Sequence, residues 1–158
     1  MKVEILKQKG HKFLWIDGYL WMWDLQVENK IQQEMAQQAY GNVLIAGYGL
    51  GLVQRHLLKN KKVKSVTTVE LVKKVIDINK KSEGKIFGAY VIGDFYKFSS
   101  KLKYDCIIGD IWADIVPSEL KYYKRFKKKA LKLLKPNGKL FAWGKDYYEF
   151  LIDKEKRT

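Results

Sequence analysis

From Asn42 onward, short runs of apolar and β-branched residues alternate with stretches of helical spacing, and this alternation constrains the fold more than any other feature. Five such runs occur, namely Val43–Ala46, Ser65–Val69, Ala89–Ile92, Tyr104–Ile108 and Lys139–Trp143. Strands that are apolar along most of their length are typical of parallel sheets with helices on both faces. The sequence therefore predicts an α/β fold with a Rossmann-like, doubly wound, mostly parallel sheet, truncated after its fifth strand.

The N-terminal part of the chain carries a different pattern. Lys12–Asp17 and Tyr19–Trp23 are rich in aromatic and β-branched residues, and they meet at an Asp-Gly dipeptide typical of tight turns. We predict a short β-hairpin here, followed by a helix at about Gln26–Gln38. The expected buried face of that helix consists of Val27, Ile31 and Met35. The chain thus divides into a hairpin extension (residues 1–25) and a Rossmann-like domain (residues 26–158).

The charge of the chain is strongly unbalanced. Its 158 residues carry a formal net charge of +14, yet only three of the 31 basic residues are arginines. Arginine is the residue that recognises phosphates and guanine through two parallel hydrogen bonds, so a surplus of lysine indicates a solvated surface rather than a nucleic-acid site. The sequence thus allows a nucleic-acid partner but does not favour one.

Metal and membrane sites find little support in the sequence. Cys106 is the one cysteine, and His11 and His56 are isolated, so we predict no metal site and no intrachain disulfide. No apolar run approaches the roughly 18 residues that span a bilayer, and the N-terminus lacks the pattern of a signal peptide. We therefore expect a cytoplasmic protein without membrane contact.

Glycines and acids follow the predicted strands at the points where those strands end. They are Gly47, Gly49 and Gly51 after the first strand, and then Glu70, Asp94 and Asp110. Doubly wound sheets bind ligands at the carboxyl ends of their strands. Glycines let a backbone pass close beneath a ligand, and the helix that follows supplies free N–H groups. These residues predict one ligand site.

The acids suggest which ligand it is. Glu70 lies about 20 residues beyond the glycine turn, where a carboxylate accepts from both ribose hydroxyls. Asp94 is placed to accept from an adenine amino group, with Leu71 and Phe95 against the ring. Each acid alone also suits a solvated strand end or a turn. Leu52 stands where a dinucleotide motif needs a small residue, so S-adenosylmethionine fits better than NAD.

Five segments resemble the spermidine synthase family, a branch of the class I S-adenosylmethionine-dependent methyltransferase superfamily. They are Gln33–Met35, Asn42–Gly51, Val66–Glu70, Gly93–Asp94 and Tyr104–Asp110. The resemblance implies that the glycine turn passes under the methionine part of S-adenosylmethionine or of its decarboxylated form. It also implies that Gln33 lines this cofactor, and that Asp110 is the catalytic aspartate that accepts a proton from the attacking amine.

Three positions depart from the family pattern. Leu50 replaces an aspartate that holds the aminopropyl ammonium group of decarboxylated S-adenosylmethionine, and Gln32 replaces a tyrosine. In the loop after Asp110, the second acid is displaced by one position, to Asp114. We therefore expect a methyltransferase acting on a small molecule. A spermidine synthase-type aminopropyltransferase is the alternative.

A third hypothesis is a non-catalytic cofactor-binding or assembly module. It rests on the fifth strand, Lys139–Trp143, which the predicted fold leaves at an edge of the sheet. Exposed edges invite pairing with another strand. We accordingly predict a homodimer.

Overall fold

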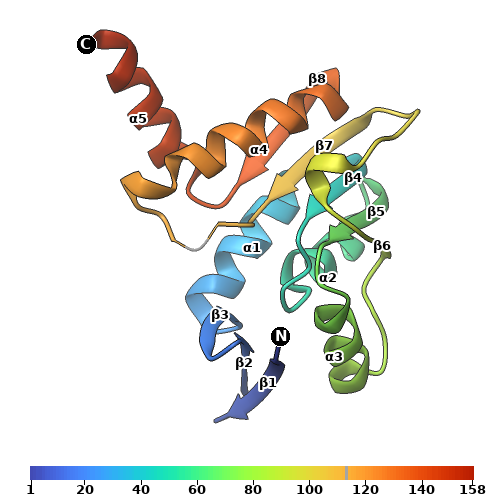
Figure 1. Ribbon diagram of the computed structural model, residues 1–158. Coiled ribbons are helices and arrows are strands. Elements are labelled where there is room, and N and C mark those ends of the chain that lie inside the picture. Colours follow the sequence, from blue (N-terminus) through green and yellow to red (C-terminus); the bar gives the residue numbers. More distant parts are fainter. Residues whose placement is uncertain (113) are drawn as a thin grey trace.

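The computed structural model describes residues 1–112 and 114–158, and it contains two sheets (Figure 1). The N-terminal sheet is antiparallel and consists of β1 (Val3–Gln8), β2 (His11–Ile16) and β3 (Tyr19–Trp23). The central sheet consists of β4 (Gly41–Ala46), β5 (Val63–Glu70), β6 (Ala89–Ile92), β7 (Tyr104–Gly109) and β8 (Leu134–Ala142). Its strands are parallel and lie in the order β6-β5-β4-β7-β8, which confirms the predicted α/β fold and places β8 at an edge.

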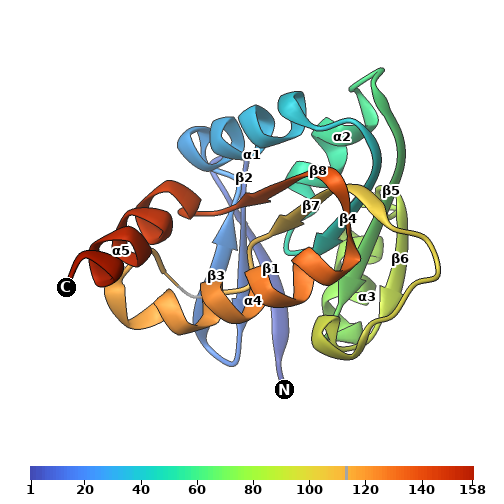
Figure 2. The ribbon, with the colours of Figure 1, turned by 90° about the horizontal axis from the view of Figure 1, so that it is seen from above.

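The described residues also form five α-helices and two short 3-10 helices, of which α5 follows the last strand. The α-helices are α1 (Gln26–Gln38), α2 (Leu52–Leu58), α3 (Lys73–Glu83), α4 (Leu120–Leu133) and α5 (Lys145–Arg157). The 3-10 helices are η1 (Phe95–Lys97) and η2 (Pro117–Glu119). In Figure 2, α1 and α2 lie on one face of the central sheet and α4 lies on the other. None of the described helices is long and apolar enough to cross a membrane.

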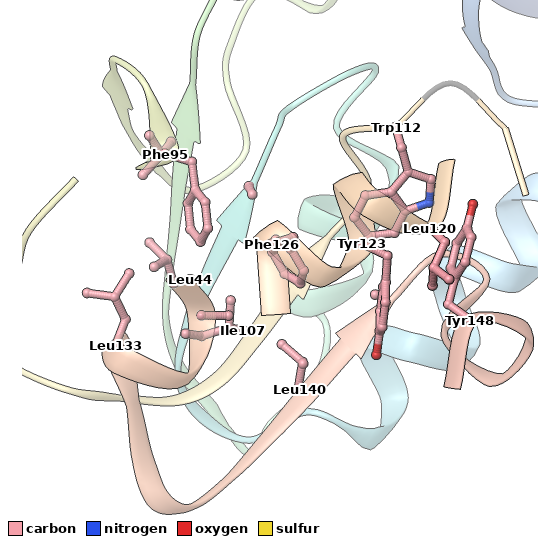
Figure 3. Close-up of a cluster of buried hydrophobic side chains, with 14 residues drawn as sticks. Leu44, Phe95, Ile107, Trp112, Leu120, Tyr123, Phe126, Leu133, Leu140 and Tyr148 are labelled. Carbon is pink, nitrogen blue, oxygen red and sulfur yellow. The ribbon is translucent and has the colours of Figure 1, made fainter. Parts of the chain in front are cut away.

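The strand β4 separates two apolar cores. Because side chains alternate along a strand, Val43 and Ile45 face α1 and α2, whereas Leu44 faces α4. The core against α4 is rich in aromatic rings: Phe126 lies between Phe95 and Trp112, with centroid distances of 5.5 and 5.6 Å (Figure 3). A sheet covered in this way has only its strand ends free for a ligand.

The N-terminal sheet has one strand more than the predicted hairpin. The hairpin of β2 and β3 is confirmed, with Asp17 and Gly18 at φ values of +48° and +80° in its turn. The additional strand β1 pairs with β2 through a second turn, at Lys9 and Gly10, which also have positive φ. The alternation of Val3 and Ile5 with charged residues is the signal that indicates this strand.

Two further details differ from the sequence prediction. On α1, Met35 is buried and Ile31 is partly buried as predicted, but Val27 is 73% exposed, and the buried face is completed by Glu28, Gln32 and Ala36. The strand β8 begins five residues before the predicted strand Lys139–Trp143, and its pairing with β7 is irregular: Tyr104 pairs with Leu134, and Cys106 already pairs with Lys139. Cys106 itself is fully buried, and burial raises the pKa of its thiol.

Gly109, the last residue of β7, provides a test of the packing against α4. A Cβ atom at this position would overlap the ring of Phe126, which is fully buried and cannot yield. We expect Gly109→Ala to lower the free energy of unfolding by about 1–3 kcal/mol, as measured by urea denaturation. Gly93→Ala is the control, because a Cβ atom at Gly93 meets open space. Equal stability of the two variants would contradict this packing.

Candidate active site

A cavity of about 660 Å³ lies at the carboxyl ends of the central strands. This volume lies within the range of about 300–1,000 Å³ that is usual for small-molecule sites. The N-terminal sheet supplies part of the wall, through Leu14, Ile16, Trp21, Met22 and Trp23. The cavity is therefore built jointly by the N-terminal sheet and the carboxyl ends of the central strands.

Most of the residues predicted from the sequence meet in this cavity. Its wall includes Gly47, Gly49, Glu70, Leu71, Asp94, Phe95 and Asp110. Gly51 is not part of the wall, although it precedes α2 in the same turn. Gln33 is exposed and lies outside the wall, and the glutamine of α1 that reaches the cavity is Gln32. Gln32 lies four residues after Glu28 on the same helix face, but both side chains are polar, so the helical pattern alone does not indicate that they are buried.

The glycine turn after β4 depends on its glycines. Gly47, Gly49 and Gly51 have φ values of +90°, +58° and +72°, a region that favours glycine. The sulfur of Met22, on β3, lies so close to Gly49 that a Cβ atom would overlap it. That sulfur also accepts a hydrogen bond from the backbone N–H of Leu50, at 3.4 Å. The turn is thereby fixed against the N-terminal sheet.

The carboxylate of Glu70 is held in one orientation at the end of β5. Its Oε1 atom accepts from the backbone N–H of Tyr48 at 2.9 Å, and its Oε2 atom accepts from that of Val72 at 2.8 Å. Each carboxylate oxygen can accept a further hydrogen bond. Glu70 is thus a fixed acceptor on the cavity wall, as hydroxyl groups of a ribose require.

Beside it, Asp94 and Phe95 form the start of η1. Asp94 Oδ1 accepts from the backbone N–H of Tyr96 at 2.9 Å, which caps this short helix and leaves Oδ2 as a further acceptor. The ring of Phe95 stacks against the ring of Phe126. Leu71, which directly follows β5, is 67% exposed. An acceptor beside apolar side chains suits a flat, amino-bearing ring.

Asp110 follows β7 and meets α1. Gln32 Nε2 donates to Asp110 Oδ2 at 3.1 Å and to Glu28 Oε1 at 2.8 Å. Burial raises the pKa of the Asp110 carboxyl, the charge of Glu28 raises it further and the hydrogen bond from Gln32 lowers it, so that this pKa is about 7. A carboxyl with this pKa exchanges its proton near neutral pH, as an acid–base catalyst must.

The cavity wall is acidic although the chain is basic. It contains five carboxylates, from Asp17, Glu28, Glu70, Asp94 and Asp110. Arg125 is the one basic side chain among the described residues of the wall, and its guanidinium lies 3.7 Å from the ring centroid of Tyr96. Opposite charges attract across a desolvated site, so this wall favours a cationic ligand.

Aromatic side chains complete the wall. Trp21, Tyr96, Trp112 and Trp143 all contribute to it. Trp112 is held in position by its Nε1 atom, which donates to the backbone carbonyl of Trp143 at 3.0 Å. Such rings pack against alkyl chains and attract cations over their faces. No group of three or more metal-ligating side chains occurs among the residues that the structure describes.

Comparison with known proteins identifies the family. The family model described as "Spermine/spermidine synthase domain" matches residues 32–152, more than half of the chain. The chain belongs to the spermine/spermidine synthase family. The resemblance seen in the sequence is thereby confirmed.

Curated relatives agree with this assignment. The polyamine aminopropyltransferase of Sulfolobus acidocaldarius is 34% identical over 63% of this chain, and that of Methanocaldococcus jannaschii is 34% identical over 61%. The matches span 37% and 36% of those proteins, so the chain covers little more than a third of their length.

The solved structures show the fold alone. A putative methyltransferase from Bacillus halodurans aligns with a TM-score of 0.54 at 20% identity, over 73% of this chain and 50% of that one. The glycopeptide N-methyltransferase MtfA, complexed with S-adenosyl-L-methionine, aligns with a TM-score of 0.53 at 18% identity, over 73% and 52%. The central sheet of the chain therefore has the Rossmann-like fold of these methyltransferases.

The raised pKa of Asp110 makes stability depend on pH. The folded chain binds this proton more tightly than the unfolded chain, so the stabilisation is complete below the unfolded pKa and is lost as the pH rises through about 7. Asp110→Asn removes this loss. We expect the free energy of unfolding of Asp110→Asn, relative to wild type, to rise by about 2–3 kcal/mol between pH 5 and pH 8.

Urea denaturation of both proteins at the two pH values measures this difference. The control is Asp153→Asn, because Asp153 is exposed on α5, and its difference from wild type should be the same at both pH values. If the difference in free energy of unfolding between Asp110→Asn and wild type did not change with pH, the raised pKa of Asp110 would be contradicted.

Proposed function

We propose that this chain transfers an aminopropyl group from decarboxylated S-adenosylmethionine to the amino group of a small di- or polyamine. The observation that carries the proposal is the acidic cavity wall, with five carboxylates and one guanidinium in a chain of net charge +14. The similarity to polyamine aminopropyltransferases supports the same reaction. This reading replaces methyl transfer, which the sequence alone favoured, as the leading one.

Charge explains why a decarboxylated donor suits this wall. Decarboxylated S-adenosylmethionine carries a sulfonium and an ammonium group, whereas S-adenosylmethionine also carries a carboxylate. That carboxylate would be repelled by the acids of the wall, and Arg125, the one basic side chain described there, is already stacked on Tyr96. Diamine acceptors are likewise doubly charged cations, so one electrostatic preference serves both substrates.

The residues of the wall fit an adenosine-containing donor. Glu70 offers fixed acceptors for ribose hydroxyls, and Asp94 offers an acceptor for the adenine amine beside Leu71 and Phe95. The glycine turn lets the rest of the donor lie close to the backbone at Gly47 and Gly49. Trp112 and Trp143 cover apolar surface, which excludes water from the reacting atoms.

Asp110 has the role of proton acceptor in this reaction. The bound donor supplies a propyl carbon next to a sulfonium; the amine lone pair forms the new carbon–nitrogen bond as the carbon–sulfur bond breaks and leaves its electron pair on sulfur. The nitrogen must then lose one proton, and Asp110 accepts it. A pKa of about 7 makes this carboxylate a better base than an ordinary aspartate.

Methyl transfer is the second candidate, and Leu50 favours it. Leu50 is 6% exposed, packs with Leu14 and Leu52 and does not belong to the cavity wall. The glycine turn therefore offers no carboxylate for an aminopropyl ammonium group. In this reading Asp110 anchors or deprotonates the acceptor of the methyl group.

The choice of donor distinguishes the two candidates. Purified protein is given a diamine and either donor, and products are measured by mass spectrometry. We expect aminopropyl transfer from the decarboxylated donor and no methylated product from S-adenosylmethionine. Asp110→Asn should lower kcat by about 10²–10⁴-fold, since general bases contribute rates of that order. Methylated product without aminopropyl transfer would overturn the proposal in favour of the second candidate.

Binding of the nucleoside product tests the donor site separately. Calorimetry with 5′-methylthioadenosine, the thioether left after aminopropyl transfer, measures affinity without chemistry. In Glu70→Gln one carboxylate oxygen becomes an NH₂ group that faces a backbone N–H, so we expect about 10–100-fold weaker binding. Asp77→Asn, on the exposed side of α3, should bind as wild type does. Unchanged affinity of Glu70→Gln would exclude Glu70 from the donor site.

A further inference from the structure

Two carboxylates from distant parts of the chain share one amide group at the wall of the cavity. Glu28 and Gln32 lie one turn apart on α1, and Asp110 lies after β7. The nitrogen of the Gln32 side chain donates to Glu28 Oε1 at 2.8 Å and to Asp110 Oδ2 at 3.1 Å. Because an amide nitrogen has two hydrogens, both donors of Gln32 are used by this bridge.

This arrangement is costly for the fold. Gln32 is 1% exposed and Glu28 is 9% exposed, whereas the apolar side chain of Val27 is 73% exposed on the same helix. The ion pairs among the described residues do not include Glu28, so its charge has no cationic partner there. Burying a carboxylate without such a partner costs free energy that an apolar residue would not. The position is therefore explained better by chemistry than by packing.

We propose that Glu28 is a positioning residue for aminopropyl transfer: through Gln32 it orients the Asp110 carboxylate, and its negative charge helps Asp110 to keep the proton taken from the amine. This inference rests on the proposed function. It assigns to α1 a part in the reaction that the glycine turn and the strand-end acids do not supply.

The charge of Glu28 is the main one that acts on Asp110. The other charged groups that face the cavity are Asp17 in the turn before β3, Glu70 at the end of β5, Asp94 before η1 and Arg125 on α4. After burial, the largest influence that raises the pKa of Asp110 is the charge of Glu28, and Gln32 opposes it. Removing the charge of Glu28 must therefore make Asp110 a weaker base.

The variant Glu28→Gln tests this role, because its amide oxygen can still accept from Gln32 while its charge is absent. The dependence of kcat on pH is measured for aminopropyl transfer. In wild type the rate rises as Asp110 loses its proton. We expect the midpoint of this rise to move to lower pH by about one unit in Glu28→Gln, with about a three- to tenfold lower plateau rate.

Two measurements separate this role from a structural one. Glu34→Gln, on the exposed side of α1, should keep the wild-type midpoint. Titration of the Asp110 carboxyl by carbon-13 NMR, on the 158-residue chain without substrates, should show the same downward shift in Glu28→Gln without any turnover. Loss of stability alone would lower the rate, but it would move neither the midpoint of the pH dependence of kcat nor the NMR titration of Asp110.

The outcomes distinguish this inference from the function on which it rests. Absence of aminopropyl transfer by the wild type at every pH overturns the proposed function, and with it the role of Glu28. Transfer by Glu28→Gln with the wild-type midpoint, together with an unshifted Asp110 titration, overturns the role of Glu28 alone.

Discussion

The parallel pairing of β4 with β7 is the constraint on which the site depends. From β4 the chain continues outward in one direction to β5 and β6, and it returns to the other side of β4 to form β7 and β8. The carboxyl ends of β4 and β7 are therefore neighbours, although the glycine turn and Asp110 are about 60 residues apart in sequence. Asp110 and the glycine turn meet because hydrogen bonds between two strands fix their distance.

The distribution of charge is the second organising feature. Lysines cover the surface, whereas the described cavity wall combines carboxylates with aromatic rings. The acids are kept there by specific contacts: Glu70 accepts two backbone N–H groups, Asp94 caps η1, and Gln32 separates Asp110 from Glu28. Each contact satisfies part of a carboxylate that would otherwise be costly to remove from water. A basic chain thus encloses a cavity with an acidic wall.

Much of the fold and part of the site could be predicted from the sequence. Short apolar strands that end in glycine or an acid are a strong local signal, and they placed Glu70, Asp94 and Asp110 at one edge of the sheet. The buried face of α1 was harder to predict, because an amphipathic pattern directs attention to apolar residues such as Val27, which is exposed. The true inner face carries Glu28 and Gln32, whose burial depends on Asp110 across the interface. Local periodicity cannot contain a requirement set by a distant strand.

The contact of β2 and β3 with the glycine turn has a thermodynamic consequence. Leu14 is fully buried against Leu50 and Leu52, and Met22 lies on Gly49. A molecule held between these strands and the central sheet would touch both parts of the chain. Its binding energy would then also oppose the separation of the small sheet from the large one, by mass action. Occupancy of the cavity and attachment of the first 25 residues are therefore linked equilibria, and each strengthens the other.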